Sequence, residues 1–517
     1  MSSSTQEANQ RHRLTHPTFS FVKDPKDLEN LSLHESPYGD LTLRAAQDLE
    51  PNSILFTLPF DSVLTYDVVR NTKLSHLIMD TAGVCCSPEI LGWLNIVCWY
   101  KADNYDEDNI YSSKHLRALS KEPPNVSSWP SYLQDLLIGT NIYSVLDVSG
   151  KNDNTLGNVH VIQKALSIVE EVRQFILLAN ASDNNNDDDD DDSKAIHSFF
   201  IPEETSIFNK SSIGWARGHF VSRRFPELKP SKFIKEIRTQ QQNQLTIGYG
   251  DRLSCFIPLL DLMNHNPEMS STCTVSLEGT DTVVIRIGRK GVKSGDELIY
   301  RYGNLSNETL LQGYGFCLED NDQDDISFRI RKHHHQQRHE NITNNNNDTA
   351  ISTTDNDGEI FFLKKGGVSG IPKEFWEAIA GNNSSDGDGD GDDDDQQLEI
   401  GLGDLQKLKE YVDGKLKDLL SAPGWLYDQN KEEAVVGATP EDNDNDDNEN
   451  DNNNKAAAIH LDRVRKQFIQ FYLKGQKEVL EKLHDDLVEM LQQCSDLEDV
   501  EEQQEEESYS DSDSDTN

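Results

Sequence analysis

Four acidic tracts limit which parts of this 517-residue chain can fold around a core. They span residues 183–192, 386–399, 441–451 and 496–517, and together they carry 33 acidic residues without one Lys or Arg. Tracts of this kind repel themselves and bury too little apolar surface to fold alone. Once their 33 negative charges are set aside, the formal charge falls from -44 to about -11, which is ordinary for a globular protein.

The rest of the sequence predicts an α+β fold. Short apolar runs between turn signals, in residues 19–65 and again after Trp215, are typical of strands. Apolar residues at i, i+3 and i+4 spacing predict helices in residues 88–180 and 359–494. We therefore expect a mostly-β core with a helical insertion, followed by an all-α region.

The expected boundaries follow from these patterns and from the acidic tracts. They are a disordered N-terminus (1–18), a first folded region (19–320) with a helical insertion (about 86–214) and an acidic loop (182–194), a polar linker (321–357), a helical region (358–495) with acidic insertions (382–397 and 440–454), and an acidic disordered tail (496–517).

Composition argues against several classes of protein. The acidic tracts do not suit nucleic-acid binding, which needs clustered Lys and Arg. No run of 18 apolar residues predicts a membrane span, and the start of the chain has no apolar segment typical of a secretory signal. Seven scattered cysteines without a CxxC pair fit reduced thiols in the cytoplasm or nucleus. The Ser-rich start leaves organellar import open.

Common cofactor motifs are absent from the sequence. No GxGxxG follows a predicted strand, and no phosphate-binding GxxxxGK[ST] occurs. HExxH and paired CxxC motifs are also absent, so no metal is expected.

Two short motifs carry the chemical signal. The first is DLMNH (Asp261 to His265), which follows a buried apolar run and could be read as a strand ending in a turn. The second is RYGNLSNETLLQGYGF (Arg301 to Phe316), which contains two tyrosines and a phenylalanine and could be read as an aromatic core cluster. Neither motif decides the function alone.

In this order and spacing, the two motifs resemble those of SET-domain methyltransferases, and in particular the Rubisco large-subunit lysine methyltransferase class. Further segments share the resemblance: SPYGDLTLRAAQDLEPNSILFTLP, SSWPSYLQDL, GWARGHFVSRRF and IQFYLKGQKEVLEKL. The resemblance covers nearly the whole chain apart from the acidic tracts. It implies a SET domain followed by a helical substrate-binding domain, with S-adenosyl-L-methionine (SAM) as the methyl donor.

The resemblance also implies roles for individual residues. Cofactor contacts fall on Gly39, Asp40, Leu41, Arg223, Asn264, His265 and Tyr302. Arg223 is expected to meet the SAM carboxylate, since a guanidinium suits two oxygens. Tyr302 is the expected catalytic residue, and the expected substrate channel consists of Phe225, Asp261, Tyr314 and Phe316. The imidazole of His265 is expected to be structural.

The predicted function is SAM-dependent methylation of a lysine in a non-histone protein, because no Cys-rich zinc module follows Phe316. The substrate is expected to bind through the SET cleft and the helical domain of a monomer, without nucleic acid or membrane. Actin-histidine methyltransferases of this class carry Asn where this chain has Phe225, and an apolar wall there favours lysine. Histidine methylation, a catalytically silent SET-like scaffold and an acidic chaperone stay open as alternatives.

The first motif departs from the family pattern. The family commonly has a second Gly there, whereas this chain reads YGDLTL, with Asp40 and Thr42. The sequence leaves open whether these side chains crowd the cofactor.

Overall fold

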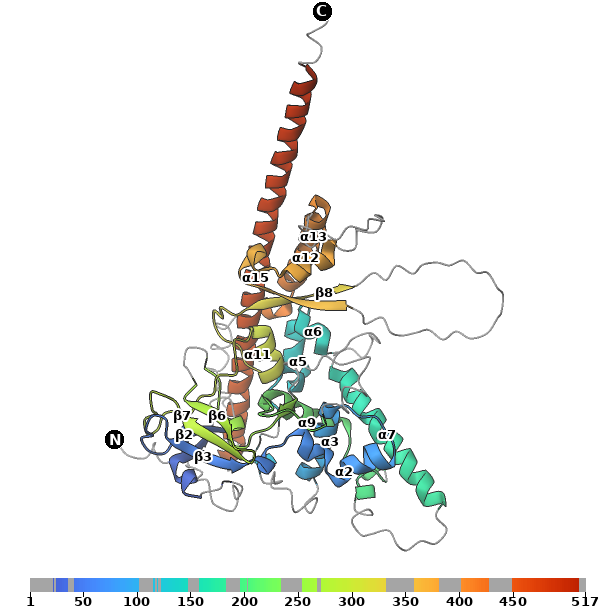
Figure 1. The fold of residues 1–517 in the computed structure, drawn as a ribbon, viewed down its shortest axis with the longest axis vertical. Helices are drawn as coiled ribbons and strands as arrows, with labels where there is room; N and C mark the ends of the chain where they lie inside the picture. The colour runs from blue at the N-terminus through green and yellow to red at the C-terminus, as the bar shows by residue number, and fades with distance from the viewer. Residues whose placement is uncertain are drawn as a thin grey trace, which may run out of the picture.

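The computed structural model (Figure 1) describes most of the regions that were expected to fold. The described residues are 22, 25–35, 41–101, 115–116, 119, 122–146, 158–182, 196–201, 203–233, 253–266, 271–331, 358–380, 401–426 and 449–510. The predicted disordered N-terminus, the acidic residues of the 182–194 loop and the acidic insertion at 382–397 lie outside this set.

Short antiparallel strands form the β part of the molecule. β1 (Leu31–Glu35) pairs with β2 (Leu41–Ala45), β7 (Thr282–Ile287) lies between β3 (Ile54–Pro59) and β6 (Cys273–Glu278), and β4 (Phe225–Pro226) pairs with β5 (Ser254–Cys255). Val283, Val284 and Ile285 are all buried, as expected for a central strand covered on both faces. The chain is therefore a mixed α and β protein, as predicted.

The segment that follows β7 connects three parts of this β region. We expected a second strand there, but the structure shows isolated bridges from Val292 to Leu49, from Glu297 to Arg44 and from Ile299 to Asn264. The segment pairs with Leu49 at Val292, with β2 through residues 295–298 and with Asn264 at Ile299, so its partner changes along its length. The result is that residues 296–300 lie between β2 and the Asn264 segment.

Helices from before and within the insertion pack with the strands. They are α1 (Tyr66–Arg70), α2 (Lys73–Ser75), α3 (Pro88–Lys101), α7 (Asn158–Ser182) and α9 (Lys210–Arg223). Two short helices of the insertion, α5 (Ser131–Gln134) and α6 (Asn141–Leu146), pack instead with the C-terminal helices. A reciprocal capping box between Asn209 and Ser212 begins α9. Apolar residues of β1–β7, α3, α7 and α9 form one continuous core, which we call the first core.

A second core lies around the C-terminal helices. It is built from α11 (Asn307–Tyr314), the hairpin of β8 (Asp325–Arg331) and β9 (Gly358–Lys364), α12 (Lys373–Ala380), α13 (Leu402–Leu420) and α15 (Glu449–Ser510). Tyr472, Leu473 and Leu480 of α15 are fully buried in it. Trp129 and Leu133 of the insertion also belong to it, so this core is not confined to the C-terminal region.

The hairpin corrects two predictions. Residues 325–331 belong to strand β8, not to a polar linker, and the region expected to be all-α begins with strand β9. Ile326 and Phe328 of β8 are buried with Phe361 and Leu363 of β9, which gives the hairpin one apolar face. Residues 321–324 of the predicted linker form the turn before β8, and residues 332–357 lie outside the described set.

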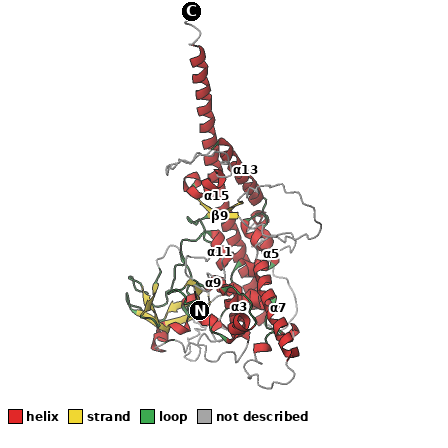
Figure 2. Ribbon diagram, turned by 45° about the vertical axis from the view of Figure 1, so that its right-hand side comes forward, coloured by secondary structure: helices red, strands yellow, loops and turns green. Residues whose placement is uncertain are grey.

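Helix α15 corrects the predicted C-terminal tail. It continues to Ser510, so residues 496–510 are helical rather than disordered, and the acidic insertion predicted at 440–454 ends within its first turns. The sequence EEQQEEE at 501–507 consists of good helix formers, which explains the continuation. Figures 1 and 2 show α15 running along the molecule and extending beyond the other elements. No described helix is both long and apolar enough to cross a membrane.

Candidate active site

The DLMNH motif is held in place by backbone hydrogen bonds. A left-handed residue, Leu259 (φ 68°), turns the chain into the 3₁₀ turn Leu260–Leu262. Asn264 then runs parallel to Ile299, and its carbonyl accepts a hydrogen bond from the Tyr300 amide at 3.0 Å. The two motifs recognised in the sequence therefore meet directly.

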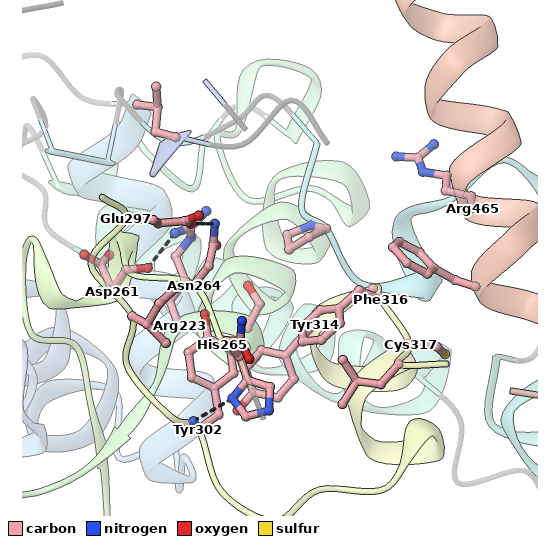
Figure 3. Close-up of a pocket in the computed structure, with 18 of the residues that line it drawn as sticks. Arg223, Asp261, Asn264, His265, Glu297, Tyr302, Tyr314, Phe316, Cys317 and Arg465 are labelled. Carbon is pink, nitrogen blue, oxygen red and sulfur yellow. Dashed lines mark hydrogen bonds between the residues drawn. The ribbon is translucent and has the colours of Figure 1, made fainter. Parts of the chain in front are cut away.

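A cavity of about 420 Å³ opens where the motifs meet (Figure 3). It brings together most of the residues predicted to form the site. These are Leu41, Arg223, Asp261, Asn264, His265, Tyr302, Tyr314 and Phe316. Polar side chains gather at one end and aromatic side chains at the other.

Three predicted residues are not placed in this cavity. Gly39 and Asp40 lie outside the described residues. Phe225 is described, but it does not line the cavity; it is buried in β4, where its ring packs edge-on against Tyr300 at 5.3 Å between centroids. Its place in a substrate channel stays a prediction.

Tyr302 lies at the centre of the aromatic end. Its hydroxyl donates to the Met263 carbonyl at 2.9 Å, and its ring stacks on Tyr314 with centroids 4.7 Å apart. The neighbouring Gly315 ends α11 in the left-handed conformation (φ 76°), where a Cβ would lie 1.7 Å from the Pro124 carbonyl oxygen. Only glycine fits there, and it sets the positions of Tyr314 and Phe316 on either side.

The imidazole of His265 supports the backbone at Tyr302. Its Nδ1 accepts a hydrogen bond from the Tyr302 amide at 3.1 Å, and its ring stacks on the Tyr302 ring. Burial lowers the pKa of His265 to about 4, and the positive charge of Arg301 adds to this shift. His265 is therefore neutral at pH 7, which agrees with the structural role expected for its side chain.

Arg223 and Asp261 form the buried end of the cavity. Arg223, in the last turn of α9, donates from Nη1 to the Asp261 carbonyl at 2.7 Å. The Asp261 carboxylate pairs with Nε2 of His115 at 2.9 Å, and both side chains are fully buried. Sequence analysis missed His115, because nothing near it in the sequence indicates that it lies against the DLMNH motif.

Glu297 and Thr42 extend the polar end. Oε1 of Glu297 accepts hydrogen bonds from Oγ1 of Thr42 and Nδ2 of Asn264, both at 2.7 Å. Glu297 lines the cavity, whereas Thr42 does not and is 1% exposed. The Thr42 side chain that departs from the family pattern is therefore directed into this hydrogen-bond network.

Helix α15 supplies a wall of the cavity that sequence analysis also missed. Leu461, Arg465 and Phe468 recur at i, i+4 and i+7, so they share one helix face. The Arg465 guanidinium lies 5.4 Å from the centre of the Trp129 ring, and Phe468 packs edge-on against Phe316 at 6.5 Å. The sequence shows the i, i+4, i+7 spacing of these residues, but it does not show which surface they face.

Solved structures with a similar fold share nearly the whole length of this chain. The SET domain of LSMT bound to lysine and AdoHcy matches with a TM-score of 0.54 at 14% identity, over 92% of each chain. Rubisco LSMT bound to AdoMet matches with a TM-score of 0.51 at 15% identity, over 90% of this chain and 91% of that one.

The protein has a SET fold. The resemblance inferred from the motifs is thus confirmed. Two curated relatives agree: ribosomal lysine N-methyltransferase set10 of Schizosaccharomyces pombe is 23% identical over 331 residues, and ribosomal lysine N-methyltransferase 1 of Saccharomyces cerevisiae is 23% identical over 263 residues. These matches cover 63% and 47% of this SET protein. The chain spans about half the length of the relatives or less, at 47% and 40%. No family model matches the chain.

Within the described residues, His, Cys, Asp and Glu side chains form no group of three or more that could hold a metal ion. The polar groups that line the cavity include the guanidinium of Arg223, the amide of Asn264 and the carboxylate of Glu297. These groups suit an organic ligand that carries both a negative and a positive charge.

Proposed function

We propose that this SET protein is a SAM-dependent protein-lysine N-methyltransferase that acts on a non-histone protein. The observation that carries the proposal is the shared cavity, in which Arg223 and Asn264 stand at one end and Tyr302 and Tyr314 at the other. Related proteins are named lysine N-methyltransferases, and solved structures of the same fold contain AdoMet or AdoHcy.

The residues of the polar end fit the amino-acid part of SAM. Arg223 would hold the carboxylate, and Asn264 with the backbone of His265 would hold the remaining methionine and adenine parts. Leu41 lines the same cavity, and Gly39 and Asp40 precede it in the chain. When bound, SAM supplies an electrophilic methyl group. The cavity volume of about 420 Å³ is within the range of small-molecule sites.

The aromatic end suits a lysine amine. A lysine must lose its proton before it can attack a methyl group, which costs about 4 to 5 kcal/mol at pH 7. An aromatic channel disfavours the charged ammonium and so lowers that cost. The Tyr302 hydroxyl, fixed on the Met263 carbonyl, would orient the neutral amine for in-line attack, and Tyr314, Phe316 and Phe225 would exclude water.

Two alternatives differ from this proposal at specific residues. Histidine methylation would need a polar group to orient an imidazole, and Phe225, the residue used to argue against it, lies outside the observed cavity. A silent scaffold would lack a usable methyl-donor site, whereas Arg223, Asn264 and Tyr302 line one cavity here. Because the position of Phe225 does not separate the two acceptors, we keep lysine on the names of the two curated relatives and treat histidine as an outcome of the test.

The substrate would be a protein bound jointly by the SET cleft and a helical C-terminal domain, residues 358–495. Support comes from α15, whose residues Leu461, Arg465 and Phe468 reach the cavity. The net charge of -44 would favour basic substrates, although salt screens such attraction beyond about 8 Å. The names of the two curated relatives make ribosomal proteins the first substrates to test.

Further parts of the proposal concern the state of the protein. We propose a monomer that binds neither nucleic acid nor membrane and works in the cytoplasm or nucleus. The seven cysteines support a reducing compartment, since all are free thiols and five of them are buried.

A labelling experiment tests the proposal. The purified protein and its Tyr302→Phe variant are incubated with labelled SAM and a lysate of the same source, and the modified residue is identified by mass spectrometry. We expect label on lysine, reduced by about 100-fold or more in the variant, since the hydroxyl positions the amine. SAM affinity of the variant, measured by calorimetry, should stay within about threefold of wild type.

The outcomes separate the alternatives. Label on an imidazole would replace lysine by histidine as the acceptor. Absence of SAM binding by the wild-type protein would overturn both enzymatic functions and leave the scaffold.

A further inference from the structure

Glu297 joins two walls of the cavity. Its Oε1 accepts one hydrogen bond from Thr42 on β2 and one from Asn264 in the DLMNH motif, each 2.7 Å long. The backbone around it is fixed on the same two sides: the Leu298 amide donates to the Leu43 carbonyl, and the Tyr300 amide donates to the Asn264 carbonyl. The carboxylate is therefore held firmly between β2 and the motif.

This contact decides which way the amide of Asn264 is turned. A carboxylate can only accept hydrogen bonds, whereas an asparagine amide carries both a donor and an acceptor. Because Nδ2 of Asn264 donates to Glu297, Oδ1 is turned away from the carboxylate and can accept a hydrogen bond from a ligand in the cavity. An amide turned the other way would place its carbonyl oxygen against the carboxylate, which is repulsive.

We propose that Glu297 is a positioning residue that presents the Asn264 carbonyl oxygen to the α-ammonium group of the methyl donor. This assignment rests on the proposed function. Arg223, at the same end of the cavity, suits the carboxylate of the same amino-acid group. The negative charge of Glu297 further favours the ammonium. Arg223 would thus bind the negative carboxylate, and Asn264 with Glu297 would bind the positive ammonium. Together they would select a zwitterionic ligand.

Thr42 has a defined part in this arrangement. Its hydroxyl occupies the second acceptor position on Oε1 of Glu297, and its side chain is buried outside the cavity lining. The residue that replaces the small residue of the family pattern therefore stabilises Glu297 and does not crowd the cavity.

The test compares two ligands in one protein. Affinities for S-adenosylhomocysteine and for its analogue without the α-amino group are measured by calorimetry for wild type, Glu297→Gln and Glu297→Leu. We expect Glu297→Gln to weaken the amino-bearing ligand several-fold and Glu297→Leu to weaken it by about tenfold or more, since a hydrogen bond to a charged group is lost. The analogue should change by less than about twofold in both variants.

Thr42→Val serves as the matched control, because it removes one hydrogen bond to Glu297 but keeps its charge and the bond to Asn264. We expect a change of less than about threefold for either ligand. Glu297→Gln is nearly isosteric, so it carries the test even where Glu297→Leu does not fold, and the melting temperature of each free protein checks folding.

Equal weakening of both ligands by Glu297→Gln would overturn the assignment and leave Glu297 a purely structural role. Unchanged affinity for the amino-bearing ligand would overturn it as well. A wild-type protein that binds neither ligand would instead overturn the proposed function, and the assignment with it.

Discussion

The two ends of the cavity are built in different ways. The polar end is formed by Arg223, Asn264 and Glu297, whose positions are fixed by hydrogen bonds to backbone and to each other within the first core. At the aromatic end, Tyr302 is held by its hydrogen bond to the Met263 carbonyl, whereas the wall formed by Tyr314, Phe316 and Phe468 comes from or adjoins α11 and α15. Polar groups are thus placed by directional bonds, and the aromatic wall is placed by packing between two helices.

This difference predicts different consequences of mutation. A change at the polar end should alter ligand affinity and leave most of the packing intact, because few apolar contacts are lost. A change at the aromatic end should lower the free energy of unfolding, because the same side chains hold the second core together.

The largest effect is expected at the polar end. Arg223→Met keeps the apolar stem but removes the guanidinium that would pair with the SAM carboxylate, and we expect SAM affinity to fall by about 1,000-fold, or about 4 kcal/mol. Calorimetry with SAM measures this loss. Arg224→Met is the matched control: Arg224 is the next residue along the chain, pairs with Glu89 and does not line the cavity, so affinity should be unchanged. Equal losses of SAM affinity in Arg223→Met and Arg224→Met would contradict the role of the polar end in ligand binding.

A medium effect is expected at the aromatic end. Phe468 is 9% exposed and packs on Phe316, so Phe468→Ala should lower the free energy of unfolding by about 3 kcal/mol through lost contacts and a new cavity. Urea unfolding measures the change. Phe468→Leu retains most of the volume and should lose about 1 kcal/mol. Full stability in Phe468→Ala would show that α15 does not depend on the aromatic wall.

The smallest effect is a pH dependence at His265. Its pKa is about 4 in the folded protein and about 6.5 in the unfolded chain, so below pH 6.5 the unfolded state binds more protons. The stabilisation contributed by His265 is therefore complete above pH 6.5 and is lost as the pH falls toward 4. Melting temperatures of wild type and His265→Asn should differ most at pH 7 and converge near pH 4.5. A constant difference across this range would contradict the folded-state pKa.

At both ends of the cavity, sequence analysis predicted the residues that lie within the two motifs better than those that come from other segments. Asn264, His265 and Tyr302 belong to contiguous motifs whose spacing is itself informative, and the structure brings them together. Phe468 was assigned to an apolar stripe with the correct period, but a stripe indicates burial and not the surface that it covers. Nothing within a few residues of His115 shows that its side chain reaches the DLMNH motif. Glu297 lies shortly before the second motif, but its contacts with Asn264 and Thr42 join segments 33 and 255 residues apart.

The errors in the fold have similar causes. Strand β8 was missed because its few alternating apolar residues, Ile326 and Phe328, are followed directly by a long polar run. Residues 496–510 were taken as disordered because charge was weighed above helix propensity. In both places the polar or charged composition of the segment was given more weight than its strand pattern or helix propensity.

Helix α15 also has a mechanical consequence. The residue that walls the cavity, Phe468, and the last residue of the helix, Ser510, belong to one uninterrupted α-helix, which at 1.5 Å per residue separates them by about 63 Å. A continuous helix resists bending and transmits both torque and axial load along its hydrogen-bonded backbone. An object attached to its outer end would therefore be kept at a set distance from the cavity. A pull there would act first on Leu483 and Leu487, the buried residues of α15 nearest that end, before it reached Phe468.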